Sequence, residues 1–304
     1  MSDSATLETP SSAIATPVLA QVRVPGWLRT LGHVASENPL SLVAAALLAG
    51  FVFVAVFGAA LAPHDPFATN AAATLQPPSA QHWFGTDPLG RDIFSRVLVG
   101  TRLDLLIALG SVVLAATGGT MLGLCAGFFG GRVEQLTGRA MDMLMAFPLF
   151  VLAMAIVAAL GNSVANIILA TAIINLPFYI RVSRTEVNVR RNAGYVEAAR
   201  LAGNSDVRIL ALHLFPNVLP PMMVQISLNM GWAILNAAGL SFIGLGVRPP
   251  QAEWGIMVAE GATYIISGEW WIALFPGATL MLVVFTFNLL GDGLRDILDP
   301  RTRT

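Results

Sequence analysis

Six long stretches of this chain are continuously apolar, and they constrain its fold more than any other feature. A helix needs roughly 20 apolar residues to cross the hydrocarbon core of a bilayer, which is about 30 Å thick. The runs cover approximately residues 40–62, 105–129, 143–160, 165–180, 219–245 and 271–290, and none has Asp, Glu, Arg or His in its interior. Barrel strands would alternate in polarity over about ten residues. The runs therefore predict an all-α polytopic membrane protein with six transmembrane helices.

The charged residues support this class and exclude another. Only 12% of the 304 residues are charged, against about a quarter in ordinary soluble proteins. The formal net charge is −1. A chain with no basic surplus cannot neutralise a phosphate backbone, so nucleic acid is not an expected partner.

The arginines indicate how the chain is oriented, because cytoplasmic loops are enriched in basic residues. With a cytoplasmic N-terminus, thirteen arginines lie inside and four, which are Arg91, Arg96, Arg102 and Arg248, lie outside. Both termini are therefore predicted to be cytoplasmic. The expected layout is a cytoplasmic tail (1–38), a first transmembrane helix (39–62), an extracytoplasmic loop (63–103), a five-helix core (104–296) and a C-terminal tail (297–304).

Two segments on the predicted outer side, 63–104 and 247–269, are rich in Pro, Trp and Gly. Such composition favours ordered loops with short helices. Four residues in the first segment could suggest a metal site: His64, Asp65, His82 and Asp87. Their spacing matches no ligand pattern. We expect them to form turns and caps, and we predict no metal site.

Small residues in the second run predict close helix packing. Gly119, Gly123 and Gly127 recur every fourth residue and share one helix face. We expect a seam inside one bundle rather than a dimer contact. Prolines within the runs predict kinks, because a freed backbone carbonyl needs another partner; they are Pro148, Pro177 and Pro276.

The fifth run carries a polar stripe. Gln225, Asn229 and Asn236 lie at about 0°, 40° and 20° around a helix that turns about 100° per residue. Trp232, at about −20°, shares this face and adds one N–H donor. Such a stripe either hydrogen-bonds adjacent helices or lines a wet pathway. The periodicity leaves both readings open.

Several energy sources and chemistries are excluded by what the chain lacks. Ion-driven carriers usually place a charged side chain inside the membrane, and the six runs have none. All 17 cationic residues are arginine, so the chain has no lysine for a phosphate-binding loop. The four histidines are scattered over both predicted sides, and no catalytic triad can be assembled. We predict no enzyme, and uphill transport would need energy from another subunit.

A polar segment between the fourth and fifth runs, YVEAARLAGNSDVRILALHLFPNVLPP (195–221), predicts a bent helical projection. Gly203 can adopt the left-handed conformation that ends a helix, and Ser205 can cap the next one. One face of the first helix carries small and aromatic residues, which are Tyr195, Ala198, Ala199 and Ala202. The charged Glu197 and Arg200 flank this face. The projection either docks onto a partner or rests on lipid headgroups as an amphipathic helix.

Several motifs in this order resemble one known family. Glu197, Ala198, Ala199, Gly203 and a proline at 216 resemble the EAA loop of permease subunits in bacterial binding-protein-dependent ABC importers, although His213 and Phe215 depart from its consensus. The segments HWFGTDPLGRDIFSRVLVGTR, AFP, SFIGLGVRPPQAEWG and FNLLGDGLRDILDP resemble the second permease of the dipeptide, oligopeptide and nickel branch.

This resemblance implies a type I ABC importer permease fold with the EAA loop at about 186–220. It also implies an inner-membrane location, a homologous second permease, two ATPase subunits and an extracytoplasmic solute-binding protein. ATP and Mg²⁺ would bind to the ATPases, and this chain would bind no cofactor. The implied ATPase-coupling residues are Tyr195, Glu197, Ala198, Ala199, Arg200 and Gly203.

The expected cargo is a di- or oligopeptide, with nickel chelates and glutathione as alternatives within the family. Two readings from other classes remain: a channel or carrier that works without ATP, and a structural membrane scaffold. Transport by the chain alone would indicate the first. A scaffold would leave the amide stripe and the outer loops without a role.

Overall fold

The structure is a computed structural model, and it describes residues 39–298. The predicted tail at 1–38 and most of the one predicted at 297–304 lie outside the described residues, and so do Arg23, Arg29, Arg301 and Arg303; residues 297 and 298 instead belong to α11. The described part is helical, and no strand occurs within it beyond an isolated bridge between Thr86 and Asp92.

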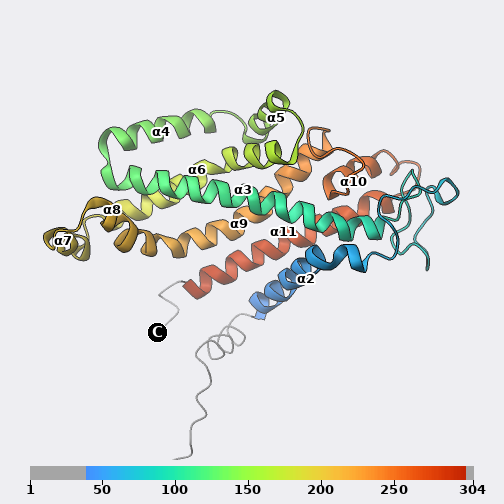
Figure 1. Cartoon of the computed structure of the whole chain (residues 1–304), viewed down its shortest axis with the longest axis horizontal. Coiled ribbons are helices and arrows are strands. Elements are labelled where there is room, and N and C mark those ends of the chain that lie inside the picture. The colour runs from blue at the N-terminus through green and yellow to red at the C-terminus, as the bar shows by residue number, and fades with distance from the viewer. Residues whose placement is uncertain (1–38, 299–304) are drawn as a thin grey trace, which may run out of the picture.

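Long helices dominate the described residues (Figure 1). The helices are α2 (Pro39–Leu61), η1 (Ala71–Ala73), α3 (Ile93–Phe129), α4 (Gly131–Met145), α5 (Leu149–Leu160), α6 (Val164–Arg190), α7 (Gly194–Leu201), α8 (Asp206–Ile209), η2 (Leu210–Leu214), α9 (Phe215–Phe242), α10 (Trp254–Ala262) and α11 (Trp271–Leu298). Five spans are long and apolar enough to cross a membrane, and α4 with α5 gives a sixth if this bent pair is one span. The predicted all-α polytopic membrane fold is confirmed.

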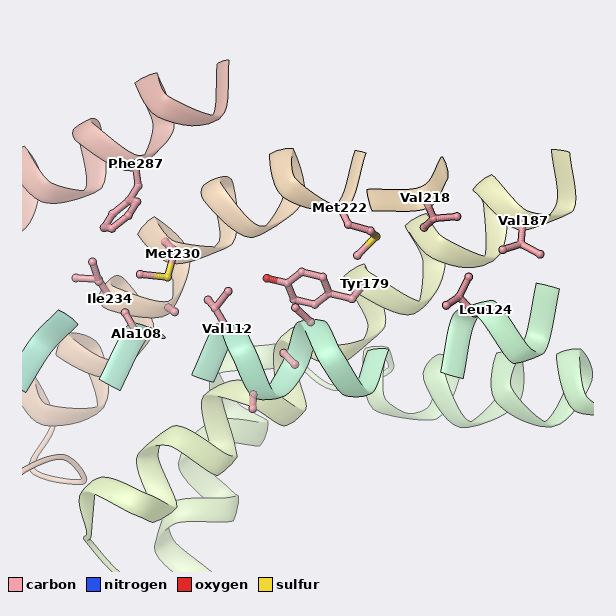
Figure 2. Packing of buried hydrophobic residues seen from close by; sticks show 14 of the residues in the cluster. Ala108, Val112, Leu124, Tyr179, Val187, Val218, Met222, Met230, Ile234 and Phe287 are labelled. Carbon is pink, nitrogen blue, oxygen red and sulfur yellow. The ribbon is translucent and has the colours of Figure 1, made fainter. Parts of the chain in front are cut away.

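Helix α3 occupies the centre of the bundle and contacts α2, α6, α9 and α11. At one end, which we call the loop end, residues 62–92 and α10 gather; at the other end, the α7 end, lie α7 and α8 (Figure 1). Apolar side chains from α3, α6, α9 and α11 fill the interior between these ends, as Figure 2 shows for Val112, Tyr179, Met222 and Phe287.

The predicted glycine seam joins α3 to α6 within this bundle. A Cβ atom on Gly119 would lie 2.6 Å from Cβ of Tyr179, and one on Gly127 would lie 2.9 Å from the carbonyl oxygen of Arg184. A Cβ atom on Gly123 would overlap the side chain of Ser183. The absence of side chains at these three positions lets the two backbones approach closely. The prediction of an internal packing seam is confirmed.

The helices differ from the predicted runs where charged residues flank an apolar core. Helix α3 begins at Ile93, twelve residues before the second run, because Asp92 caps it by accepting a hydrogen bond from the Ser95 N–H. Helix α6 continues to Arg190, ten residues beyond the fourth run. Hydropathy detects only the apolar part of a helix, so the polar ends were assigned to loops.

The third run is not one straight helix. It is divided between α4 and α5, which meet at an angle of 87° across residues 146–148. Pro148 precedes α5, as expected of a residue with no N–H to continue the α4 ladder. Pro177 and Pro276 lie inside continuous helices, α6 and α11.

Candidate functional site

The polar stripe of α9 faces a cavity of about 370 Å³ between α5, α6 and α9. Gln225, Asn229 and Asn236 all lie on its wall, together with Trp232. The rest of the lining is Leu149, Phe150, Ile174, Asn175, Phe178 and Leu228. The cavity is therefore apolar, with four amide side chains and no charged group. The structure brings the three predicted amides together.

The amides in this cavity are only partly paired with each other. The Gln225 Nε2 donates a hydrogen bond of 3.2 Å to Asn229 Oδ1. Asn229 is buried, and its side chain also interacts with the hydroxyl group of Tyr179, which does not line the cavity. Gln225 and Asn236 are only partly buried, so their amides are the ones available to whatever occupies the cavity.

The cavity is also open to one side of the chain. Trp232 lines it and is 61% exposed, so its ring forms a rim. Sequence periodicity found the α9 half of this wall. It missed Asn175 and Phe178, which α6 contributes through tertiary packing that a single sequence does not encode locally.

The α7 end contains the bent projection that the sequence predicts. Helix α7 ends at Leu201, Gly203 follows with φ = +78°, and Ser205 caps α8 by accepting from the Arg208 N–H. The Asn204 Nδ2 donates to the carbonyl of Ala199 at 3.0 Å, which closes the turn. The predicted glycine stop and serine cap are confirmed.

The exposed face of α7 differs from the predicted one. Ala199 is only 7% exposed and packs with the buried Val196 against the bundle. The reason is that the larger Val196 must be buried, and Ala199 is its neighbour one turn later. The guanidinium of Arg200 lies 5.4 Å from the ring centre of Phe128, so it leans on α3. Tyr195, Glu197, Ala198 and Gly203 remain exposed.

A second, smaller cavity of about 50 Å³ lies between α4 and α6. Its charged lining residues are Asp142, Arg181 and Arg184. The sequence alone does not reveal this cavity, because these residues flank two different apolar runs and only the contact between α4 and α6 joins them.

The loop end is cross-linked by polar groups that the sequence analysis assigned to loops. Asp104 instead lies inside α3, where it is buried and its Oδ2 accepts from the Trp254 N–H at 3.1 Å. Glu253 is also buried and caps α10, where its carboxylate oxygens accept from the N–H groups of Gly255 and Ile256. Burial raises the pKa of Glu253 above its usual value.

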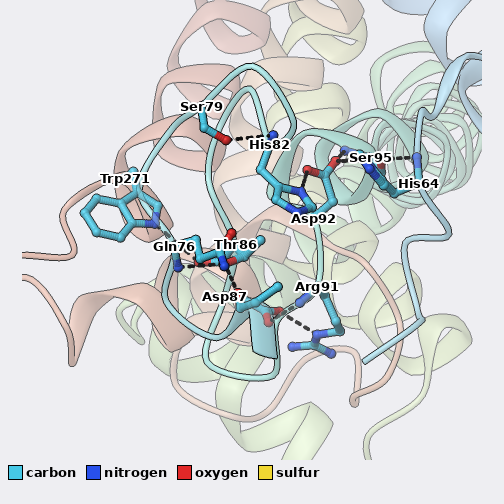
Figure 3. A network of polar contacts seen from close by, with 11 residues as sticks. His64, Gln76, Ser79, His82, Thr86, Asp87, Arg91, Asp92, Ser95 and Trp271 are labelled. Atoms are coloured by element: carbon cyan, nitrogen blue, oxygen red, sulfur yellow. Dashed lines mark hydrogen bonds and ion pairs between the residues drawn. The ribbon is translucent and has the colours of Figure 1, made fainter. Parts of the chain in front are cut away.

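Further contacts tie the first loop to α10 and α11. Arg91 bridges Asp87 and Glu260, with 3.1 Å between its Nη2 and Glu260 Oε2. The Trp271 Nε1 donates to the carbonyl of Thr86 at 3.3 Å (Figure 3). These bonds hold segments that are more than 160 residues apart in the chain.

The predicted turn and capping roles are confirmed for two residues of this loop. Asp65 accepts from the Phe67 N–H, and Asp87 accepts from the N–H groups of Leu89 and Arg91. His64 and His82, by contrast, converge on Asp92, a residue that the sequence analysis did not consider.

Comparisons with known proteins agree with this architecture. Residues 119–304 match the family described as "Binding-protein-dependent transport system inner membrane component". Residues 35–78 match "N-terminal TM domain of oligopeptide transport permease C".

Similar curated proteins cover most of the chain. It is 47% identical to the probable D,D-dipeptide transport system permease protein DdpC of Escherichia coli K12 over 87% of this chain and 88% of that protein. It is 43% identical to the dipeptide transport system permease protein DppC of Alkalihalophilus pseudofirmus, over 88% of each chain. It is 42% identical to the glutathione transport system permease protein GsiD of Escherichia coli O1:K1, over 87% of each. The chain therefore belongs to the family of inner membrane components of binding-protein-dependent transport systems.

Proposed function

We propose that this chain is a permease subunit of an ATP-driven ABC importer and forms, with a homologous second permease, the translocation path for di- or oligopeptides. The observation that carries the proposal is the uncharged amide cavity between α5, α6 and α9. A peptide offers one amide N–H and one carbonyl per residue, and amide side chains can pair with both. An uncharged wall also avoids trapping peptides by the charge of their side chains.

The openness of the cavity supports a second permease. Its rim residue Trp232 is more than half exposed, and the indole N–H needs a hydrogen-bond acceptor that lipid tails do not offer. A homologous subunit that covers α5 and α9 would bury this ring and complete the wall of the path.

The α7 end supports coupling to separate ATPase subunits. Leu201 and Val207, which flank the turn at Gly203, are 90% and 73% exposed, and exposed apolar groups close together favour a protein contact. Together with Tyr195, Glu197 and Ala198 they form the proposed docking surface. Ala199 lies behind this surface because it is buried against the bundle, and the exposed Arg200 lies beside it, next to Phe128. Many arginines near this end support its cytoplasmic orientation.

In this proposal ATP and Mg²⁺ bind to the ATPases, this chain binds no cofactor, and a solute-binding protein delivers peptides to the loop end. The core of 104–296 forms the path, and helix 39–62 precedes it. Peptides are favoured over glutathione because the similar dipeptide permeases are slightly more identical to this chain.

The test is uptake by proteoliposomes that hold the complete importer. Gln225→Leu and Asn236→Leu should lower dipeptide uptake several-fold at unchanged assembly. Gln135→Leu, on the exposed face of α4, is the matched control and should transport normally. Equal uptake by all three variants would contradict a path through this cavity.

Parallel assays separate the alternatives. Uptake by vesicles that contain this chain alone would indicate a channel or carrier independent of ATP. Faster uptake of glutathione than of dipeptides would move the cargo assignment to glutathione. Peptide-stimulated ATP hydrolysis that survives Leu201→Glu in α7 would contradict the proposed docking surface.

A further inference from the structure

Two histidines and an aspartate converge at the loop end. His64 follows the end of α2, His82 lies within the first loop, and Asp92 caps α3. One ligand atom from each of the three residues lies within 4.8 Å of the others. Figure 3 shows both imidazole rings directed at the carboxylate of Asp92. Since the three residues come from three separate segments, the fold alone brings them together.

The three possible ligand atoms are near enough to one another for a single cation to reach them all. His82 Nδ1 lies 2.9 Å from Asp92 Oδ1, and His64 Nδ1 lies 3.8 Å from Asp92 Oδ2. Zinc binds nitrogen and oxygen ligands at about 2.0–2.1 Å, which places neighbouring ligands of a tetrahedron about 3.3 Å apart. The two distances run to different oxygens of Asp92, so a turn of the carboxylate and a shift of the exposed His64 ring would bring both nitrogens around one cation.

A hydrogen-bonded cluster explains this arrangement less well. Asp92 Oδ2 already accepts from the N–H and Oγ of Ser95, at 2.8 and 2.7 Å. His64 Nδ1 is too far from that oxygen for a hydrogen bond, yet its ring lies 4.8 Å from the His82 ring. Two imidazoles face one carboxylate, and only His82 hydrogen-bonds to it. A shared cation would engage both rings at once.

The ligands are also held by groups around them, as metal ligands usually are. The Ser95 Oγ accepts from the backbone N–H of His64 at 3.2 Å, and the Ser79 Oγ accepts from that of His82 at 3.1 Å. The His64 side chain is 42% exposed while Asp92 is buried. Hydrogen bonds to Ser95 and Ser79 therefore hold the two histidine backbones in place, and the exposed His64 ring lets solvent reach the site.

We propose that His64, His82 and Asp92 bind a Zn²⁺ ion, with water in the fourth position. Two imidazoles and one carboxylate are ligands that zinc accepts readily. The ion would tie the chain after α2, and the loop around His82, to the first turn of α3. This assignment is independent of the transported cargo and of the proposed function.

The test uses the full chain, without a polyhistidine tag, in nanodiscs. After chelator treatment and dialysis, Zn²⁺ is titrated by calorimetry, and bound metal is counted by mass spectrometry. We expect one Zn²⁺ per chain. His64→Ala should weaken binding by more than about 10-fold, the lower limit for losing a group that merely orients a ligand. Because the His64 side chain is 42% exposed, this variant removes little packing.

Two further variants sharpen the result. Asp92→Asn keeps the helix cap, because Asn and Asp cap equally well, but should also weaken Zn²⁺ binding by more than about 10-fold. His213→Ala, in η2, is the control and should bind like the unaltered chain. Failure to bind Zn²⁺, or equal affinity in all variants, would overturn the proposal. On addition of Zn²⁺, hydrogen exchange in residues 64–95 should slow in the unaltered chain and in His213→Ala, but not in His64→Ala or Asp92→Asn.

Discussion

The glycine seam between α3 and α6 allows a matched pair of substitutions. A Cβ atom at Gly123 would lie 2.6 Å from the carbonyl oxygen of Ile180 and would also overlap Ser183. A Cβ atom at Gly118, in the same helix, would lie 3.4 Å from Cδ1 of Leu176, which is an ordinary contact. Alanine is therefore tolerated at one position and excluded at the other.

The expected magnitudes follow from two opposing terms. Replacing glycine by alanine in a helix gains up to about 1 kcal/mol at either position. Overpacking costs typically about 1–3 kcal/mol, and it applies to Gly123→Ala alone. Because the helix term cancels, the two variants should differ by about 1–3 kcal/mol. The backbone oxygen of Ile180 cannot rotate away, so the seam must open.

The measurement is thermal unfolding of the detergent-solubilised chain, followed by tryptophan fluorescence. Gly118→Ala should unfold at or above the temperature of the unaltered chain, and Gly123→Ala several degrees below it. Adding Ser183→Ala to Gly123→Ala should not restore stability, because the overlap with Ile180 remains. Equal unfolding temperatures for the two single variants would refute the reasoning.

Three further predictions concern the two ends of the bundle. Burial raises the pKa of Glu253, so the folded chain favours the neutral form of this carboxyl group. The contribution of Glu253 to the free energy of unfolding should be greatest below pH about 4.5 and fall as pH rises through the raised pKa. Glu253→Gln should flatten this slope in unfolding temperatures measured from pH 4.5 to 8, and an unchanged slope would contradict the assignment. Gly203→Ala should cost about 1–2 kcal/mol through its positive φ alone, since an added Cβ meets nothing within 4 Å; faster hydrogen exchange in the turn would report it, and unchanged exchange would count against it. Trp254→Phe removes the 3.1 Å hydrogen bond from Nε1 to the Val97 carbonyl and should lower the free energy of unfolding by about 1–3 kcal/mol; denaturant unfolding would show no change if this bond were unimportant.

Hydropathy was sufficient to predict the helical membrane fold, because each span depends on local composition. It could not place the first turns of α3, where Arg96, Arg102 and Asp104 interrupt the apolar pattern. The cap formed by Asp92 and Ser95 was the available signal. The bend between α4 and α5 is anticipated only as a kink at Pro148, since the angle depends on packing against α6.

The candidate sites were predictable to the extent that each lies on one helix. Period 3.6 groups Gln225, Asn229 and Asn236 without any knowledge of their neighbours. Asn175 joins the same cavity through contact between α6 and α9, and Asp104 accepts from the Trp254 N–H, which is 150 residues away in the chain. Such pairings depend on the tertiary fold. A single sequence therefore gave no basis for them.

The polar bonds at the loop end have a mechanical consequence. The bond from Trp254 to Val97 joins α3 to α10, and the pair of Arg91 and Glu260 joins the segment just before α3 to α10. At about 1.5 Å per residue, the 37 residues of α3 extend about 55 Å from this clamp. Each degree of tilt about the clamped end therefore moves the opposite tip by about 1 Å. A tilt of α3 about its first turns would therefore produce its largest displacement at Phe128, which lies beside Arg200 of α7.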